Sequence, residues 1–129
     1  MPNTDNEIIA KYAKEVKEKL LQGKHYKIIF SAAAKLKSQY RKIPMQEVTN
    51  RLRNPENLIV AEPQAANSEG EEKYNCYFGF TRHLAHRYVI IFKHKEEEIL
   101  IASVIKIERQ WQKEAEKRVH AENKNRMQL

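Results

Sequence analysis

Arginine, histidine and tyrosine side chains gather in one stretch of this sequence, between Lys73 and Lys95. Guanidinium groups bind phosphate oxygens, imidazoles exchange protons near neutral pH, and aromatic rings stack on nucleobases. Cleavage of RNA without a metal needs such groups: a base, an acid, and cations that stabilise the phosphorane. The candidates are His86 and His83 for proton transfer, Arg82 and Arg87 for phosphate binding, and Tyr88 and Tyr77 for contact with bases.

The same stretch does not have the spacing of a metal site. Cys76 is the only cysteine, and His83 and His86 are three positions apart, which places them on opposite faces of a continuous strand. The sequence also has no glycine-rich phosphate loop and no Gly-x-Ser-x-Gly nucleophile motif. We therefore expect neither a bound metal nor a cofactor.

The stretch alternates β-branched and aromatic residues with polar ones, a pattern typical of antiparallel strands. A hairpin with its tight turn at Leu84-Ala85 would place Arg82 opposite Arg87. The same register would bring Tyr77 and Tyr88 together on the other face of the hairpin. The predicted strands cover Tyr74–Arg82, His86–His94 and Glu98–Ile107, with the first tight turn at Leu84-Ala85.

Two interpretations remain open for these side chains. Arginines in facing positions repel each other unless an anion lies between them, and phosphate matches the guanidinium geometry. The alternative is that both arginines extend into water at the hairpin tip. The tyrosines could likewise form an RNA-stacking surface or pack in the ordinary way beneath a helix.

Helices and short strands are predicted on both sides of this hairpin. Apolar residues at helical spacing predict a first helix that ends at Gly23 and a last helix that reaches about Asn123. The last helix has an apolar stripe one residue wide, so we expect it either to lie along the body or to dock on a partner. The remaining predictions are strands at His25–Phe30 and Leu58–Ala61, helices at Ala32–Tyr40 and from Pro44 to Asn54, and an exposed loop at Gln64–Glu72.

With 129 residues the chain is expected to form one domain with a core of its own. A helix at residues 1–23 precedes the core at residues 25–107, and a helix with a frayed tail occupies residues 108–129. The element order predicts an α+β fold: a curved antiparallel sheet of four to five strands with helices on one face.

The net charge of +7 is unevenly distributed. Residues 54–72 hold only acidic charges and residues 73–95 only basic ones, while residues 11–53 are predominantly basic. Separate basic blocks favour a polyanion such as RNA as a partner, although lysine-rich faces also serve solubility alone. A single cysteine, a polar N-terminus and no long apolar run predict a cytoplasmic protein without a membrane segment.

Two groups of motifs resemble a known family. Phe30-Ser31-x-x-Ala34, Arg41-x-Ile43, Glu47-Val48 and Asn54-Pro55-Glu56-Asn57 resemble the first half of small domains related to the BrnT and RelE toxins, and Arg87–Phe92 with Ile99–Ile107 is similar to their closing strands. The resemblance covers about residues 25–107 and implies a RelE-like fold with metal-independent ribonuclease activity. These relatives commonly have a histidine in Ser-x-His-Ala, where this chain has Ala33. The resemblance thus implies a lost catalytic histidine, or its replacement by His83 or His86.

Two functional hypotheses follow. The first is a RelE-like ribonuclease of a toxin–antitoxin type system, with an antitoxin-like protein as its partner. The second is a non-catalytic RNA- or protein-binding module on the same scaffold, with the last helix around Trp111 as the docking element.

Overall fold

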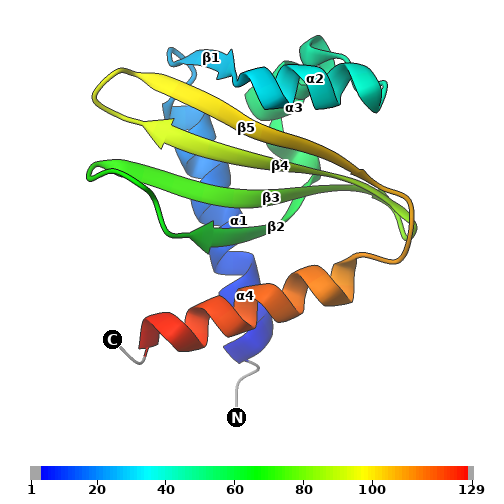
Figure 1. Cartoon of the computed structure of the whole chain (residues 1–129). Helices are drawn as coiled ribbons and strands as arrows, with labels where there is room; N and C mark the ends of the chain where they lie inside the picture. The colour runs from blue at the N-terminus through cyan, green and yellow to red at the C-terminus, as the bar shows by residue number, and fades with distance from the viewer. Residues whose placement is uncertain (1–3, 128–129) are drawn as a thin grey trace.

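The computed structural model describes the backbone of residues 4–127 and the side chains of residues 7–124. The described residues form four helices and a five-stranded sheet, which confirms the predicted α+β class (Figure 1). The elements are α1 (Thr4–Gln22), β1 (Lys27–Phe30), α2 (Ala32–Tyr40), α3 (Met45–Arg53), a 3-10 turn (Pro55–Asn57), β2 (Leu58–Gln64), β3 (Glu71–Thr81), β4 (Leu84–Lys93), β5 (Glu98–Ile107) and α4 (Gln112–Met127).

The sheet is mixed, so the expectation of a purely antiparallel sheet is wrong. Its strand order is β1-β5-β4-β3-β2, and β1 runs parallel to β5 while the other neighbours are antiparallel. A parallel pair needs a long crossover, and the chain between β1 and β5 includes two helices and three strands. β2 lies at the other edge of the sheet, which is why Pro63 is tolerated inside it rather than ending it.

One face of the sheet forms the main core. α1 and α3 cover this face, and Figure 1 shows α1 crossing behind the strands. The buried side chains there come from alternate positions of each strand, as period-2 geometry requires. They include Val16 and Leu20 of α1, Val48 and Leu52 of α3, Phe78 of β3, and Tyr88, Ile90 and Phe92 of β4.

α2 protects the edge of β5 that β1 leaves uncovered. β1 pairs only with residues 98–101 of β5. Beyond that point Ser31 Oγ donates to the carbonyl oxygen of Ala102 at 3.2 Å, and Arg41 Nη1 donates to that of Val104 at 2.8 Å. Side chains at both ends of α2 therefore satisfy backbone acceptors that would otherwise invite pairing with another strand.

The β3–β4 hairpin turns two residues earlier than predicted. Arg82 and His83 form the turn, Tyr77 pairs with Arg87, and the irregularity between Gly79 and Thr81 shows a bulge. A shift of this kind moves every side chain of β3 to the other face relative to β4. The predicted Arg82–Arg87 pair therefore does not exist, and Tyr77 and Tyr88 lie on opposite faces of the sheet.

α4 lies along β2 and reaches the face opposite the main core, so the last helix packs along the body, the first of the two placements expected for it (Figure 1). Trp111, Ala115 and Val119 are buried, so the narrow apolar stripe of the last helix packs within the chain itself. No helix of the described residues is long and apolar enough to cross a membrane.

Candidate phosphate-binding surface

The structure separates the six predicted site residues into three places. His86 and Tyr88 face the main core beneath α3, whereas Arg87 and Tyr77 lie on the opposite face beside α4. Arg82 and His83 are exposed in the turn of the hairpin. The sequence-based grouping into one catalytic surface is therefore not observed.

His86 and Tyr88 are buried and bonded to each other. The Nδ1 atom of His86 lies 2.8 Å from the Tyr88 hydroxyl oxygen, and the edge of the Phe80 ring packs against the imidazole. Burial lowers the pKa of His86; the charge of Glu47 opposes this shift, and the charge of Arg51 adds to it. Tyr88 is 0% exposed, so its ring cannot stack on a base. This pair serves the core, contrary to the predicted roles in proton transfer and stacking.

Trp111 fastens the start of α4 to the hairpin. Its indole N–H donates to the carbonyl oxygen of Thr81 at 3.0 Å, and its ring lies nearly parallel to that of Tyr77, with centroids 6.1 Å apart. Gly79 makes room for the indole, because a Cβ atom there would lie 2.5 Å from Cζ2 of Trp111. Both rings are almost fully buried, so Tyr77 also anchors the fold instead of stacking on a base.

Three arginines surround a single carboxylate at this junction. Arg109 Nη1 lies 2.7 Å and Arg118 Nη2 lies 3.4 Å from the Glu114 carboxylate, and Arg87 lines the same crevice. The hydrogen bond from Arg109 lowers the pKa of Glu114, and the charges of Arg118 and Arg87 lower it further. The buried Nε atom of Arg87 has no hydrogen-bond partner among the described residues. Three guanidinium groups thus face a single carboxylate at this junction.

An open hollow of about 770 Å³ lies along the first turns of α4 and shares Trp111 and Glu114 with this crevice. Arg82 of the hairpin turn lines it on one side, and Lys113 and Lys117 of α4 line it on the other. Glu116 also borders the hollow, but its carboxylate accepts a hydrogen bond from Gln112 at 3.1 Å. We call the crevice and the hollow together the basic groove; its cationic residues are Arg82, Arg87, Arg109, Lys113, Lys117 and Arg118.

The basic groove is suited to phosphate groups. Guanidinium forks donate paired hydrogen bonds to phosphate oxygens, and lysines add charge without demanding one geometry. The rings of Trp111 and Tyr77 are buried beneath it, so bases find no exposed ring of these two residues to stack on. The arrangement therefore favours contact with a phosphate backbone over recognition of particular bases.

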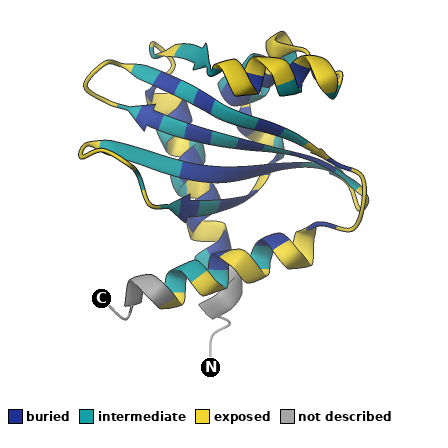
Figure 2. Cartoon of the chain, in the orientation of Figure 1, coloured by how far each residue is buried: buried dark blue, intermediate teal, exposed yellow. Residues whose placement is uncertain are grey.

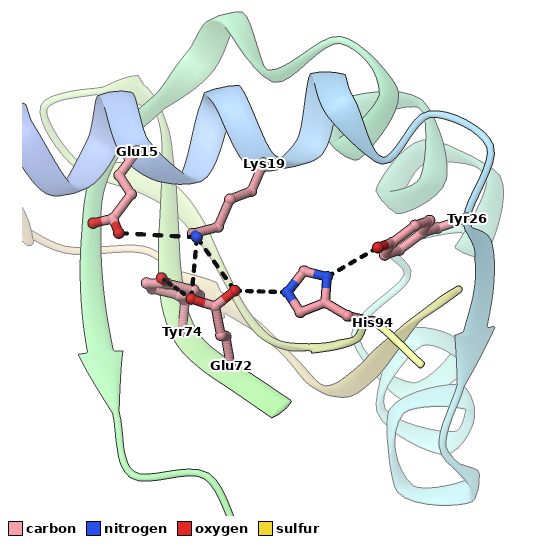
Figure 3. Close-up of polar contacts among 6 residues, drawn as sticks. All are labelled: Glu15, Lys19, Tyr26, Glu72, Tyr74 and His94. Atoms are coloured by element: carbon pink, nitrogen blue, oxygen red, sulfur yellow. Dashed lines mark hydrogen bonds and ion pairs between the residues drawn. The ribbon is translucent and has the colours of Figure 1, made fainter. Parts of the chain in front are cut away.

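A second polar cluster joins α1 to the far ends of β3 and β4 (Figure 3). The Nε2 atom of His94 lies 2.6 Å from Glu72 Oε1, and its Nδ1 atom lies 2.9 Å from the Tyr26 hydroxyl oxygen. Lys19 Nζ lies 3.0 Å from the other oxygen of Glu72. Burial raises the pKa of Glu72, but the hydrogen bonds from His94 and Lys19 outweigh it and leave that pKa below its ordinary value.

This cluster can relay a proton between a carboxylate and a phenol, because the imidazole of His94 contacts both. Its charge does not suit a polyanion, since Glu72 and Glu15 both lie beside the one ammonium group of Lys19. The contacts of the cluster instead hold α1 against the sheet. Among the described residues, no three His, Cys, Asp or Glu side chains approach closely enough to hold a metal ion.

Sequence reasoning missed four of the six cationic residues of the basic groove. Arg109, Lys113, Lys117 and Arg118 belong to a segment whose basic and acidic charges balance, so charge counting did not select it. A usable signal was present in the placement of these residues around Trp111, at the start of a helix with a narrow apolar stripe. When one large residue anchors a helix, the side chains next to that residue lie close to the surface on which it packs.

Comparison of the chain with protein-family models, curated proteins and solved structures found no match. The relation to the BrnT and RelE toxins therefore stays a prediction from the motifs. Ala33, at the position where those relatives have histidine, is exposed on α2. It therefore lies on a different helix from α4, which borders the basic groove.

Proposed function

We propose that this chain binds RNA through the phosphate backbone, with the basic groove as the contact surface. The observation that supports this most directly is the convergence of Arg87, Arg109 and Arg118 on one carboxylate, with an unpaired guanidinium nitrogen on Arg87. Backbone contacts supply affinity that depends strongly on salt and little on sequence. This proposal corresponds to the non-catalytic binding hypothesis.

A ribonuclease activity is the second candidate, and it rests on His83. His83 is exposed in the hairpin turn and directly follows Arg82, which lines the groove. The other predicted catalytic residue, His86, is buried on the opposite face. Metal-independent cleavage by this domain would therefore use His83 as its proton-transfer group.

The test is a salt titration of fluorescently labelled RNA with the full chain and single variants. Loss of one phosphate contact lowers the slope of log affinity against log salt by about one and weakens binding for all sequences alike. We expect this for Arg87→Ala and Arg118→Ala. Lys17→Ala on α1 is the matched control and should leave binding unchanged.

Equal losses for Arg87→Ala and Lys17→Ala would show that binding reflects total charge rather than the groove. A gel without added metal, run with the parent chain and with His83→Ala, tests cleavage. Cleavage that disappears in His83→Ala while binding persists would establish the ribonuclease candidate. Binding without cleavage would leave the domain as an RNA-binding module.

A further inference from the structure

α2 presents large apolar side chains to solvent. Only Ala34 and Ser38 of its nine residues are buried, and Figure 2 shows most of the helix as exposed. Leu36 is 67% exposed and Tyr40 is 85% exposed. These two residues are four positions apart and therefore share one face of the helix. Met45, at the start of α3, is 43% exposed.

The backbone beneath these side chains is firmly held. Ser38 Oγ donates to the carbonyl oxygen of Ile43, and the amide of Ile43 returns a bond of 2.9 Å to the carbonyl of Ser38. Lys42 turns the chain between α2 and α3 with a positive φ of 55°. Together with the bond from Arg41 to β5, these contacts fix the corner, so the exposed side chains project from a rigid scaffold.

The surroundings of this apolar ridge are basic. An open hollow of about 590 Å³ adjoins it, bordered by Lys35, Lys42 and Met45. Within the described part of the chain, Lys35, Lys37 and Lys42 form no ion pair. The sequence between Glu18 and Glu47 contains no acidic residue, so no carboxylate from the same segment can neutralise them.

We propose that this surface docks an acidic amphipathic segment of a partner protein. We call it the α2 surface: Lys35, Leu36, Gln39, Tyr40, Lys42 and Met45. Exposed leucine, tyrosine and methionine at a helix corner give such a segment an apolar face to cover, and unpaired lysines at the rim attract its carboxylates. The proposal does not depend on RNA binding, because the α2 surface and the basic groove share no residue: α2 packs on β5, and the groove lies between α4 and the β3–β4 hairpin.

Two other occupants fit these residues less well. A second copy of this chain would bring two basic α2 surfaces together, and like charges oppose that contact. RNA would gain stacking from Tyr40 alone, since Leu36 and Met45 offer bases no aromatic ring. The charge and the aliphatic content together therefore favour a protein.

The test uses a fluorescent helical peptide with leucines on one face and glutamates on the other, and a scrambled peptide of the same composition. We expect the full chain to bind the amphipathic peptide about tenfold more tightly than the scrambled one. The double variant Leu36→Ser with Tyr40→Ser should lose about tenfold in affinity or more. Leu21→Ser removes another exposed leucine, 48% exposed on α1, and should leave affinity unchanged.

Amide chemical shifts that change at α2 and at Met45 on peptide addition would locate the contact and support the proposal. Equal affinity for both peptides, or an equal loss in Leu21→Ser, would overturn it by showing nonspecific attraction. Dimers in sedimentation that the double variant dissociates would assign the surface to a second copy. A loss of RNA affinity in Tyr40→Ser as large as in Arg87→Ala would assign it to RNA. Either result would also overturn the proposal.

Discussion

Glu114 pairs with two arginines of the basic groove, which is the proposed contact surface for RNA phosphates. Its carboxylate receives hydrogen bonds from Arg109 and Arg118, so it competes with any incoming anion for the same donors. We expect Glu114→Gln to raise RNA affinity severalfold at low salt and to increase the salt slope by about one. Glu116→Gln is the matched control, because Glu116 is bonded to Gln112 rather than to an arginine. Anisotropy titrations that show equal gains for both variants would contradict a specific role of Glu114.

His86 provides a prediction about pH at the same scale. Because burial lowers the pKa of His86 from 6.5, the unfolded chain binds a proton more readily than the folded chain does. The free energy of unfolding should therefore be fully maintained above pH 6.5 and should fall as the pH drops below that value. Urea unfolding at a series of pH values measures this. Glutamine cannot titrate, so His86→Gln should flatten the plot of unfolding free energy against pH below pH 6.5. If the plot is the same in this variant, another group causes the pH dependence.

Single residues also show where inference from sequence ends. Arg87 was predicted as a phosphate ligand from its type and from the absence of local acids, and the structure places it in the basic groove. Its neighbours Arg109 and Arg118 were not predicted, because they come from the β5–α4 connection and from α4, across a turn and a strand in sequence. Tyr88 was assigned to the wrong environment although its strand was correct, since no local signal says which face of a strand a helix will cover.

Among the elements, α4 depends on a single close fit to the hairpin. Gly79→Ala would place a Cβ atom 2.5 Å from Cζ2 of Trp111, so either the indole or the strand must move. We expect the substitution to destabilise the chain by about 1–3 kcal/mol, as overpacking commonly does, and to weaken RNA binding by displacing Arg109 and Arg118. Thermal unfolding and the RNA titration measure the two effects.

A double-mutant cycle separates the clash with Trp111 from any other effect of Gly79→Ala on the strand. In a Trp111→Ala background the indole is gone, so Gly79→Ala should cost little further stability. An undiminished cost in that background would show that Trp111 is not the group with which Cβ collides.

The boundaries of the elements followed from sequence more readily than their pairing did. Helices at Ala32–Tyr40 and after Pro44, and the strand Glu98–Ile107, are observed where periodicity and proline predicted them. The hairpin turn was misplaced because the bulge after Gly79 lets Arg82 and His83 form the turn without glycine and without a positive φ. The parallel pairing of β1 with β5 joins strands that are far apart in sequence. The alternation of hydrophobic residues within a strand does not indicate which strand it pairs with.

At the scale of the whole molecule, the two proposed surfaces belong to different helices. α2 lies beside β5 and β1, and α4 lies beside β2 (Figure 1). The two surfaces share no residue. The screening length is about 8 Å at physiological salt, so charges farther apart than this should interact only weakly.

The chain should therefore bind RNA and an acidic peptide at the same time. We expect Leu36→Ser with Tyr40→Ser to leave RNA affinity within about twofold, and Arg87→Ala to leave peptide affinity within the same range, because distant sites act additively. Saturating peptide should likewise leave the RNA affinity almost unchanged at physiological salt, while at low salt the longer screening length lets the negative peptide weaken RNA binding. Competition that persists at physiological salt would mean that both ligands use one surface. A ternary complex in sedimentation velocity, containing one RNA and one peptide, would show that the two surfaces serve separate partners.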